Sequence, residues 1–223
     1  MIPRVLEPEA METPEEVRQY DAMDHSAVNA RFAEDFLAVH RPCRGGEVLD
    51  VGTGTARIPI ALALLDRQAR VLALDLSDAM LKQAEKNITA AGLSHRIRSH
   101  HGEAKSLVDL FGEGSFEAVI SNTIIHHIPH PEPVLADLAR LVAHRGTLFV
   151  RDLARPRSAL EIFRLGEMYA SSESPSARAL FEASLGAALT LLEIRAIVVS
   201  LGHDPNTVSM TSDRHWTWIW RRP

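Results

Sequence analysis

The chain has little of several features that would define its class at once. It contains one cysteine, Cys43, among 223 residues, which excludes an intramolecular disulfide and a thiolate metal cage. Its net charge of −5 lacks the basic surplus that a nucleic-acid backbone favours. No apolar run reaches the ~18 residues of a membrane-spanning helix, and no signal-like segment opens the chain. We therefore expect a cytoplasmic protein without nucleic-acid or membrane partners.

The negative charge is concentrated at the N-terminus. Residues 1–25 hold seven acidic and two basic side chains, whereas the rest of the chain has 22 of each. Hydrophobic residues make up 46% and charged residues 24%, the ordinary proportions of a globular protein. The length suits one domain with a sizeable core. The acidic segment is consistent with a lid or with an arm that docks another protein.

Hydrophobic patterning predicts alternating strands and helices. Strands are expected at 47–51, 70–75, 96–100, 116–121 and 147–152, and helices at 14–40, 58–66, 78–91 and 131–143. This alternation predicts a parallel sheet with helices on both faces. Residues 156–202 are expected to be mainly helical, with a break at 171–175, and the chain closes on strands at 207–210 and 215–221.

The most informative segment is a glycine-rich turn, Asp50-x-Gly52-x-Gly54, directly after the first apolar strand. Glycines at such a turn let the backbone approach a ligand closely. Asp75 ends the next strand, where an acid can accept hydrogen bonds from a ribose. The pattern therefore indicates a nucleoside-binding site.

The residues after the turn argue against two nucleotide-binding fingerprints. Arg57 stands where a dinucleotide fold has its third glycine, and a long side chain there conflicts with close helix–strand packing. No Gly-Lys-Ser/Thr follows, which excludes a phosphate loop. The variant present has Ala56 in place of the last glycine of the strictest motif.

Over most of residues 45–152 the chain resembles the class I S-adenosylmethionine-dependent methyltransferases, in particular the ubiquinone/menaquinone-biosynthesis type. The matching segments are the glycine turn, Asp75, Gly102-Glu103-Ala104, residues 116–129 and residues 146–152. The resemblance implies an α/β, Rossmann-like, doubly wound sheet of seven strands in the order 3-2-1-4-5-7-6. It also implies an antiparallel last strand and a helical insert before the terminal hairpin.

The same resemblance implies S-adenosyl-L-methionine as cofactor. In the family the glycine turn cradles the amino-acid end of the cofactor, the acid ending strand two binds the ribose, and apolar residues after it lie near the adenine. The residues expected at this site are Asp50, Gly52, Thr53, Gly54, Asp75, Leu76, Met80, Gly102, Glu103, Ala104 and Asn122.

A single methyltransferase domain over residues 1–223 is expected to have four parts. These are an N-terminal helical lid (1–44), a cofactor-binding core (45–152), an acceptor-side helical insert (153–203) and a terminal β-hairpin (204–223). Phe163, Met168, Tyr169 and Phe181 of the insert line either an acceptor pocket or the core. The alternating Trp216, Trp218 and Trp220 favour sheet packing.

Three histidines are candidates for a catalytic base, because an unperturbed imidazole has a pKa near 6.5. They are His127 after strand four, His25 in the N-terminal segment and His215 at the hairpin. Each is equally explained as a turn or surface residue. His126 and His130 flank His127, yet no carboxylate or thiolate accompanies them at ligand spacing, so no metal site is expected.

The function that follows is in-line methyl transfer from S-adenosylmethionine to a small molecule with an oxygen, nitrogen or carbon nucleophile. One alternative is a non-catalytic protein that binds adenosylmethionine as a regulatory or interaction module. A further alternative is an NAD(P)-dependent oxidoreductase. A homodimer is possible. The sequence names neither the acceptor, nor the atom methylated, nor the need for a side-chain base.

Overall fold

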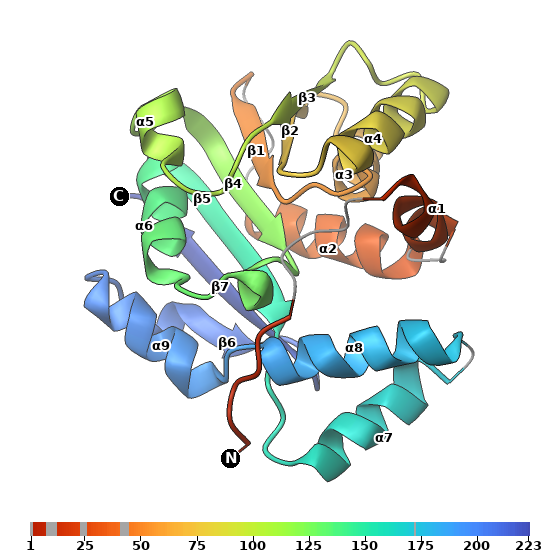
Figure 1. The fold of residues 1–223 in the computed structure, drawn as a ribbon. Helices are drawn as coiled ribbons and strands as arrows, with labels where there is room; N and C mark the ends of the chain where they lie inside the picture. Colours follow the sequence, from red (N-terminus) through yellow and green to blue (C-terminus); the bar gives the residue numbers. More distant parts are fainter. Residues whose placement is uncertain (1, 8–12, 23–25, 41–44, 172) are drawn as a thin grey trace. The chain divides into compact units, whose positions relative to one another are not determined.

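The computed structural model describes residues 2–7, 13–22, 26–40, 45–171 and 173–223. Its strands form one sheet in the order β3-β2-β1-β4-β5-β7-β6 (Figure 1). β1 to β4 pair in parallel, and β6 pairs antiparallel with β7. The predicted fold class and strand order are therefore confirmed. The strands are β1 (Glu47–Val51), β2 (Arg70–Asp75), β3 (Ile97–His101), β4 (Phe116–Asn122), β5 (Val142–Leu153), β6 (Val208–Met210) and β7 (His215–Arg221).

By its internal contacts the chain divides into two compact units. Unit 1 comprises Met1–Glu9, Thr123–Glu132 and Val150–Ile219, and unit 2 comprises Ala10–Asn122, Pro133–Phe149 and Trp220–Pro223. The four parts expected from the sequence remain predictions. Among the described residues, no helix has the length and apolar character needed to cross a membrane.

Unit 2 contains the helices α1 (Pro14–Ala22), α2 (Ser26–Val39), α3 (Arg57–Leu65), α4 (Asp78–Ala90), α5 (Leu107–Phe111) and most of α6 (Glu132–Leu141). β1 is buried almost throughout, as the apolar run of a central parallel strand predicts. Phe32 and Phe36 of α2 pack edge-on against Phe149 of β5, with ring centroids 5.1 and 5.9 Å apart. These contacts fix the sheet from which the glycine turn emerges.

The helix expected at 78–91 is α4, and local signals mark both of its ends. Ser77 is the N-cap residue, and its hydroxyl accepts a hydrogen bond from the Met80 amide. Gly92 follows the C-cap with φ +70°, the left-handed conformation that glycine adopts without strain. As a result β2 and α4 are joined by a short, defined turn that contains Asp75.

The start of β5 differs from the prediction. The sequence predicts a helix at 131–143 and a strand at 147–152, whereas α6 ends at Leu141 and β5 begins at Val142. Arg145 has φ +62° within the strand. A Cβ on Gly146 would lie 2.6 Å from the Glu117 carbonyl oxygen, so only glycine fits there. Residues 145–146 thus form an irregularity inside a strand that is longer than predicted.

Unit 1 contains η1 (Ile125–His127), α7 (Ala159–Tyr169), α8 (Pro175–Ala187), α9 (Leu191–Ser200) and η2 (Pro205–Thr207). The sequence showed the break before α8 but not the one after it, where Thr190 and Glu193 form a capping box that starts α9. Trp216 and Trp218 of β7 are fully buried, in line with sheet packing.

Candidate functional site

The glycine turn is fixed to the end of the neighbouring strand. The amides of Gly52 and Thr53 both donate to the Leu74 carbonyl oxygen at 2.9 Å. Gly52, Gly54 and Ala56 have φ values of +76°, +55° and +61°. Glycine takes this conformation freely, whereas alanine pays a steric cost for it. The turn is therefore held in one shape, with a small strain at Ala56.

The carboxylate of Asp75 joins this turn to the end of β2. Its Oδ2 accepts from the Gly54 amide at 2.7 Å and its Oδ1 from the Ser77 amide at 2.9 Å. Burial raises the pKa of Asp75, against the effect of these hydrogen bonds. A Cβ built on Gly54 would meet no atom within 4 Å. The turn thus faces open space beside a carboxylate, which fits a nucleoside carrying an amino-acid chain.

Asp50 lies beneath the turn rather than on its open side. It is 2% exposed, and its Oδ2 accepts from the Thr53 hydroxyl at 2.7 Å. Burial raises its pKa to about 7. The arrangement makes Asp50 and Thr53 supports of the turn's shape.

The other predicted cofactor residues surround the same strand ends. The Gly102 amide donates to the Asp75 carbonyl oxygen at 3.0 Å. This bond joins the segment that follows β3 to the end of β2. Leu76 is exposed and Met80 is buried at the start of α4. Glu103 is exposed, while Ala104 and Asn122 (the last residue of β4) are partly buried. All eleven residues belong to unit 2.

Helix α1 is tied to the elements around the glycine turn, and Figure 1 shows it beside α4. The Asp21 carboxylate accepts two bonds from Arg57, at 2.9 and 2.8 Å, and further bonds from Gln83 and Asn87 at 3.1 Å. Asn87 also donates to the Thr55 carbonyl oxygen at 3.0 Å. The long side chain of Arg57 is therefore directed outward to an ion pair, and it anchors the N-terminal helix.

Tyr20 of α1 lies close enough to this site for its pKa to be affected by the charges there. Burial raises the pKa of the Tyr20 hydroxyl, and the carboxylates of Asp75 and Asp21 add to the effect. His25, the candidate base of the same segment, lies outside the described residues.

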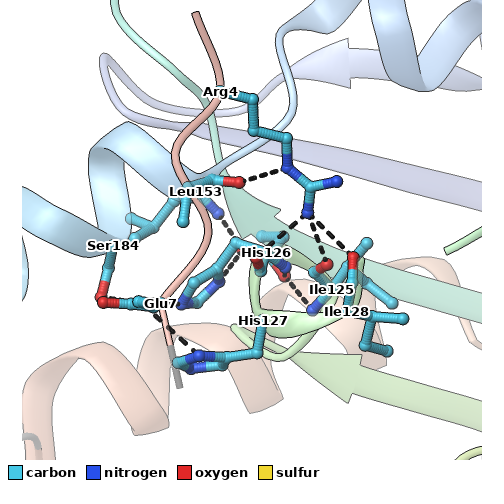
Figure 2. Close-up of polar contacts among 10 residues, drawn as sticks. Arg4, Glu7, Ile125, His126, His127, Ile128, Leu153 and Ser184 are labelled. Atoms are coloured by element: carbon cyan, nitrogen blue, oxygen red, sulfur yellow. Dashed lines mark hydrogen bonds and ion pairs between the residues drawn. The ribbon is translucent and has the colours of Figure 1, made fainter. Parts of the chain in front are cut away.

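A second polar cluster lies in unit 1, around His126 (Figure 2). His126 is buried, and its Nδ1 lies 2.6 Å from Oδ1 of Asp152. Oδ2 of Asp152 accepts from the amides of Ile125 and His126 at 2.5 and 3.2 Å, and Oδ1 accepts from the Leu153 amide at 2.6 Å. One buried carboxylate thus fixes both the backbone of η1 and the orientation of the His126 ring.

Glu7 reaches the opposite side of the His126 ring. Its Oε1 lies 3.3 Å from Nε2 of His126 and 3.5 Å from Nδ1 of His127, and it accepts from the Ser184 hydroxyl at 2.7 Å. Burial alone would lower the pKa of His126, but the carboxylates of Asp152 and Glu7 raise it to about 9. The predicted candidate His127 is therefore part of a histidine–carboxylate cluster.

Arg4 holds the N-terminal segment in place. Its guanidinium donates to the carbonyl oxygens of Ala187 (2.6 Å), Ile128 (3.0 Å) and His126 (3.1 Å), with longer contacts to two neighbouring carbonyls. The Val5 amide donates to the Gly186 carbonyl oxygen at 3.2 Å. These bonds position Glu7 within unit 1.

The third candidate base, His215, has a different environment. Its Nδ1 lies 2.8 Å from the Ser212 hydroxyl oxygen. Burial, with the positive charges of Arg214 and Arg151, lowers the pKa of His215 to about 4. Its imidazole is therefore neutral at pH 7 and a weak proton acceptor.

Of the insert residues singled out in the sequence, Phe163, Met168 and Tyr169 are exposed on α7. Phe181 packs against the buried cluster around Leu153. The sequence did not single out Arg4, Glu7 or Asp152. Asp152 ends a predicted strand, which is a weak signal, and the two N-terminal residues carry none.

Comparison with known proteins agrees with the glycine-turn geometry. Residues 48–146 match the family model described as a methyltransferase domain. A ubiquinone biosynthesis O-methyltransferase of Xanthomonas oryzae is 31% identical over 137 residues, 60% of this chain and 54% of that protein. A phosphatidylethanolamine N-methyltransferase of Cereibacter sphaeroides is 30% identical over 124 residues, 55% of this chain and 59% of that protein. The chain therefore spans little more than half the length of these curated relatives.

The fold is also found among solved structures. A putative S-adenosyl-L-methionine-dependent methyltransferase from Methanococcus maripaludis superimposes with a TM-score of 0.68 at 15% identity, covering 98% of this chain and 97% of that one. At this identity the likeness concerns the fold alone. Residues 48–146 are thus similar in sequence to methyltransferase domains, and the geometry of the glycine turn agrees with that similarity.

Proposed function

We propose that this protein transfers the methyl group of S-adenosylmethionine to a small-molecule acceptor. The observation that carries the proposal is the 2.7 Å hydrogen bond from the Gly54 amide to the Asp75 carboxylate. It joins the backbone that would hold the amino-acid end to the acid that would hold the ribose. Both groups are in place before the ligand arrives, which lowers the cost of ordering them on binding.

The residues around the turn have defined tasks in this proposal. When bound, the cofactor supplies an electrophilic methyl group on a sulfonium centre. Gly52 and Gly54 leave room for its amino-acid end, and the free lone pairs of the Asp75 carboxylate accept from the ribose hydroxyls. Leu76 and Met80 provide apolar surface for the adenine, and Glu103 accepts from its exocyclic amine. Helix α1 closes over this site through Asp21.

The acceptor is proposed to be a small molecule rather than a nucleic acid, because the net charge of −5 offers no excess of cations for phosphates. Oxygen, nitrogen and carbon nucleophiles remain candidates, and the curated relatives include both an O- and an N-methyltransferase. His127 is a better candidate base than His215, whose lowered pKa makes it a poor proton acceptor. A base at His25, a homodimer and a cytoplasmic location remain predictions from the sequence.

Binding and turnover separate this proposal from its rivals. Calorimetric titration should give one adenosylmethionine per chain and weaker binding of NADH. Tighter binding of NADH would favour an oxidoreductase. Turnover is then followed as adenosylhomocysteine formation across a panel of phenols, amines and carbon acids. Tight cofactor binding without turnover on any of them would favour the non-catalytic module.

A further inference from the structure

Three side chains with metal-binding atoms meet in unit 1, although they come from two distant segments. Oε1 of Glu7, Nε2 of His126 and Nδ1 of His127 all lie within 4.8 Å of one another. Figure 2 shows both imidazole rings beside the Glu7 carboxylate. Two imidazole nitrogens and one carboxylate oxygen form a donor set that Zn²⁺ uses in proteins. This grouping is not predictable from the sequence, because the carboxylate is far from the histidines along the chain.

The spacing of these atoms fits a shared cation better than direct hydrogen bonds. Charge-assisted N–H···O⁻ bonds are about 2.7–2.9 Å long, and His126 makes a bond of this short kind to Asp152 at 2.6 Å. Towards Glu7 the distances are 3.3 Å from His126 and 3.5 Å from His127. Two ligands of a tetrahedral Zn²⁺, each about 2.0–2.1 Å from the metal, lie about 3.3–3.4 Å apart. Both distances are thus close to the separation of two ligand atoms in a tetrahedral zinc site.

The groups behind these atoms are those that orient metal ligands. Asp152 holds Nδ1 of His126 and leaves Nε2 directed at Glu7, as in the carboxylate–histidine–metal arrangement. The Ser184 hydroxyl donates to Glu7 at 2.7 Å and restricts its rotation. Arg4 anchors the segment that carries Glu7 through bonds to three or more carbonyls. Two of the three ligands, His126 and Glu7, are therefore each held by a second bond.

We propose that Glu7, His126 and His127 bind one divalent transition-metal ion of the kind that prefers imidazole, with Zn²⁺ as the matching ion. Three protein ligands leave the fourth tetrahedral position for water or for an oxygen atom of a ligand. Binding displaces the protons from the ligating nitrogens. It also makes His127 a ligand through Nδ1, not a proton acceptor at that atom. The site lies within unit 1, and metal binding there is measured without methyl transfer, but it replaces the role of His127 as a candidate base.

The test is a titration of the full chain, dialysed against a chelator, with Zn²⁺ in competition with a chromophoric chelator. We expect one Zn²⁺ per chain. Glu7→Gln and His127→Gln should each weaken binding at least about 100-fold, because each removes a direct ligand where loss of a supporting residue already costs about 10–100-fold. His130→Gln, which changes an exposed neighbouring histidine outside the cluster, is the control and should bind as the wild type does.

Two further measurements keep the result clear. Circular dichroism and the metal-free melting temperature establish that each variant is folded, and Co²⁺ in place of Zn²⁺ should give the intense visible absorption of a four-coordinate ion. Absence of stoichiometric Zn²⁺ binding to the wild type would overturn the proposal and leave the cluster as an imidazolium between two carboxylates. Equal affinity in the wild type and both folded ligand variants would overturn it as well, because the metal would then sit elsewhere.

Discussion

Replacement of Asp75 by alanine tests the link between the glycine turn and the cofactor. The carboxylate already accepts from the Gly54 and Ser77 amides, and it keeps acceptor capacity for a ribose hydroxyl. A hydrogen bond to a charged group contributes about 1.5–3 kcal/mol, so the loss of even one ribose bond should weaken adenosylmethionine binding at least about tenfold. Loosening of the turn at Gly54 adds to this loss.

The assay is isothermal titration of the purified chain with adenosylmethionine and with adenosylhomocysteine. Asp78→Ala is the matched control, because it removes an exposed acid three residues further along, in the first turn of α4. Asp75→Ala should also lower the free energy of unfolding by about 1 kcal/mol, since two amides lose their acceptor at a partly hydrated turn. An affinity within twofold of the wild type, in a variant with unchanged circular dichroism, would refute the role given to Asp75.

Three further predictions concern stability. Ala56→Gly should lower the free energy of unfolding by at least about 1 kcal/mol less than Ala63→Gly in the helix that follows, because of these two residues only Ala56 has a positive φ that glycine relieves. Equal losses in urea unfolding would contradict the strain at this turn. The pKa of Asp50 is raised to about 7, so the unfolded chain ionises first and stability falls as the pH rises from about 4 to about 7. Asp50→Asn should remove up to about 4 kcal/mol of this pH-dependent loss in the free energy of unfolding, measured on the cofactor-free protein at several pH values. If the free energy of unfolding of the variant depends on pH as that of the wild type does, the pKa of Asp50 is not raised. Arg4→Lys keeps the charge but not the several directed donors, so it should speed hydrogen exchange at the Val5 amide about tenfold or more, and unchanged exchange would show that Arg4 does not hold the segment.

The sequence signals behind the proposed cofactor site are local. Two of these signals lie at the ends of apolar strands: the glycines Gly52 and Gly54 follow β1, and Asp75 ends β2. Because β1 and β2 are neighbouring parallel strands, their ends lie close together. Ser77 and Gly92 mark the ends of α4 for the same reason, since a cap depends on a few adjacent residues. Local steric and hydrogen-bonding rules are sufficient at these positions.

The sequence could not predict contacts between distant segments. The pairing of Asp21 with Arg57 and the meeting of Glu7 with His126 depend on how two separate helices or loops pack, which no periodicity encodes. Arg57 does not point inward, where its long side chain would clash, because the ion pair with Asp21 draws it outward. The early start of β5 was missed because Leu141 and Val142 continue the apolar pattern of the helix before it.

Asp152 sets a strict limit on what sequence change this fold can tolerate. Its two oxygens accept from four donors, three backbone amides and one imidazole, which is the full capacity of a carboxylate. Asparagine would present its amide protons to some of these donors, and glutamate would displace the acceptor by a methylene. Selection for folding from a library of all twenty residues at this position should therefore return aspartate alone.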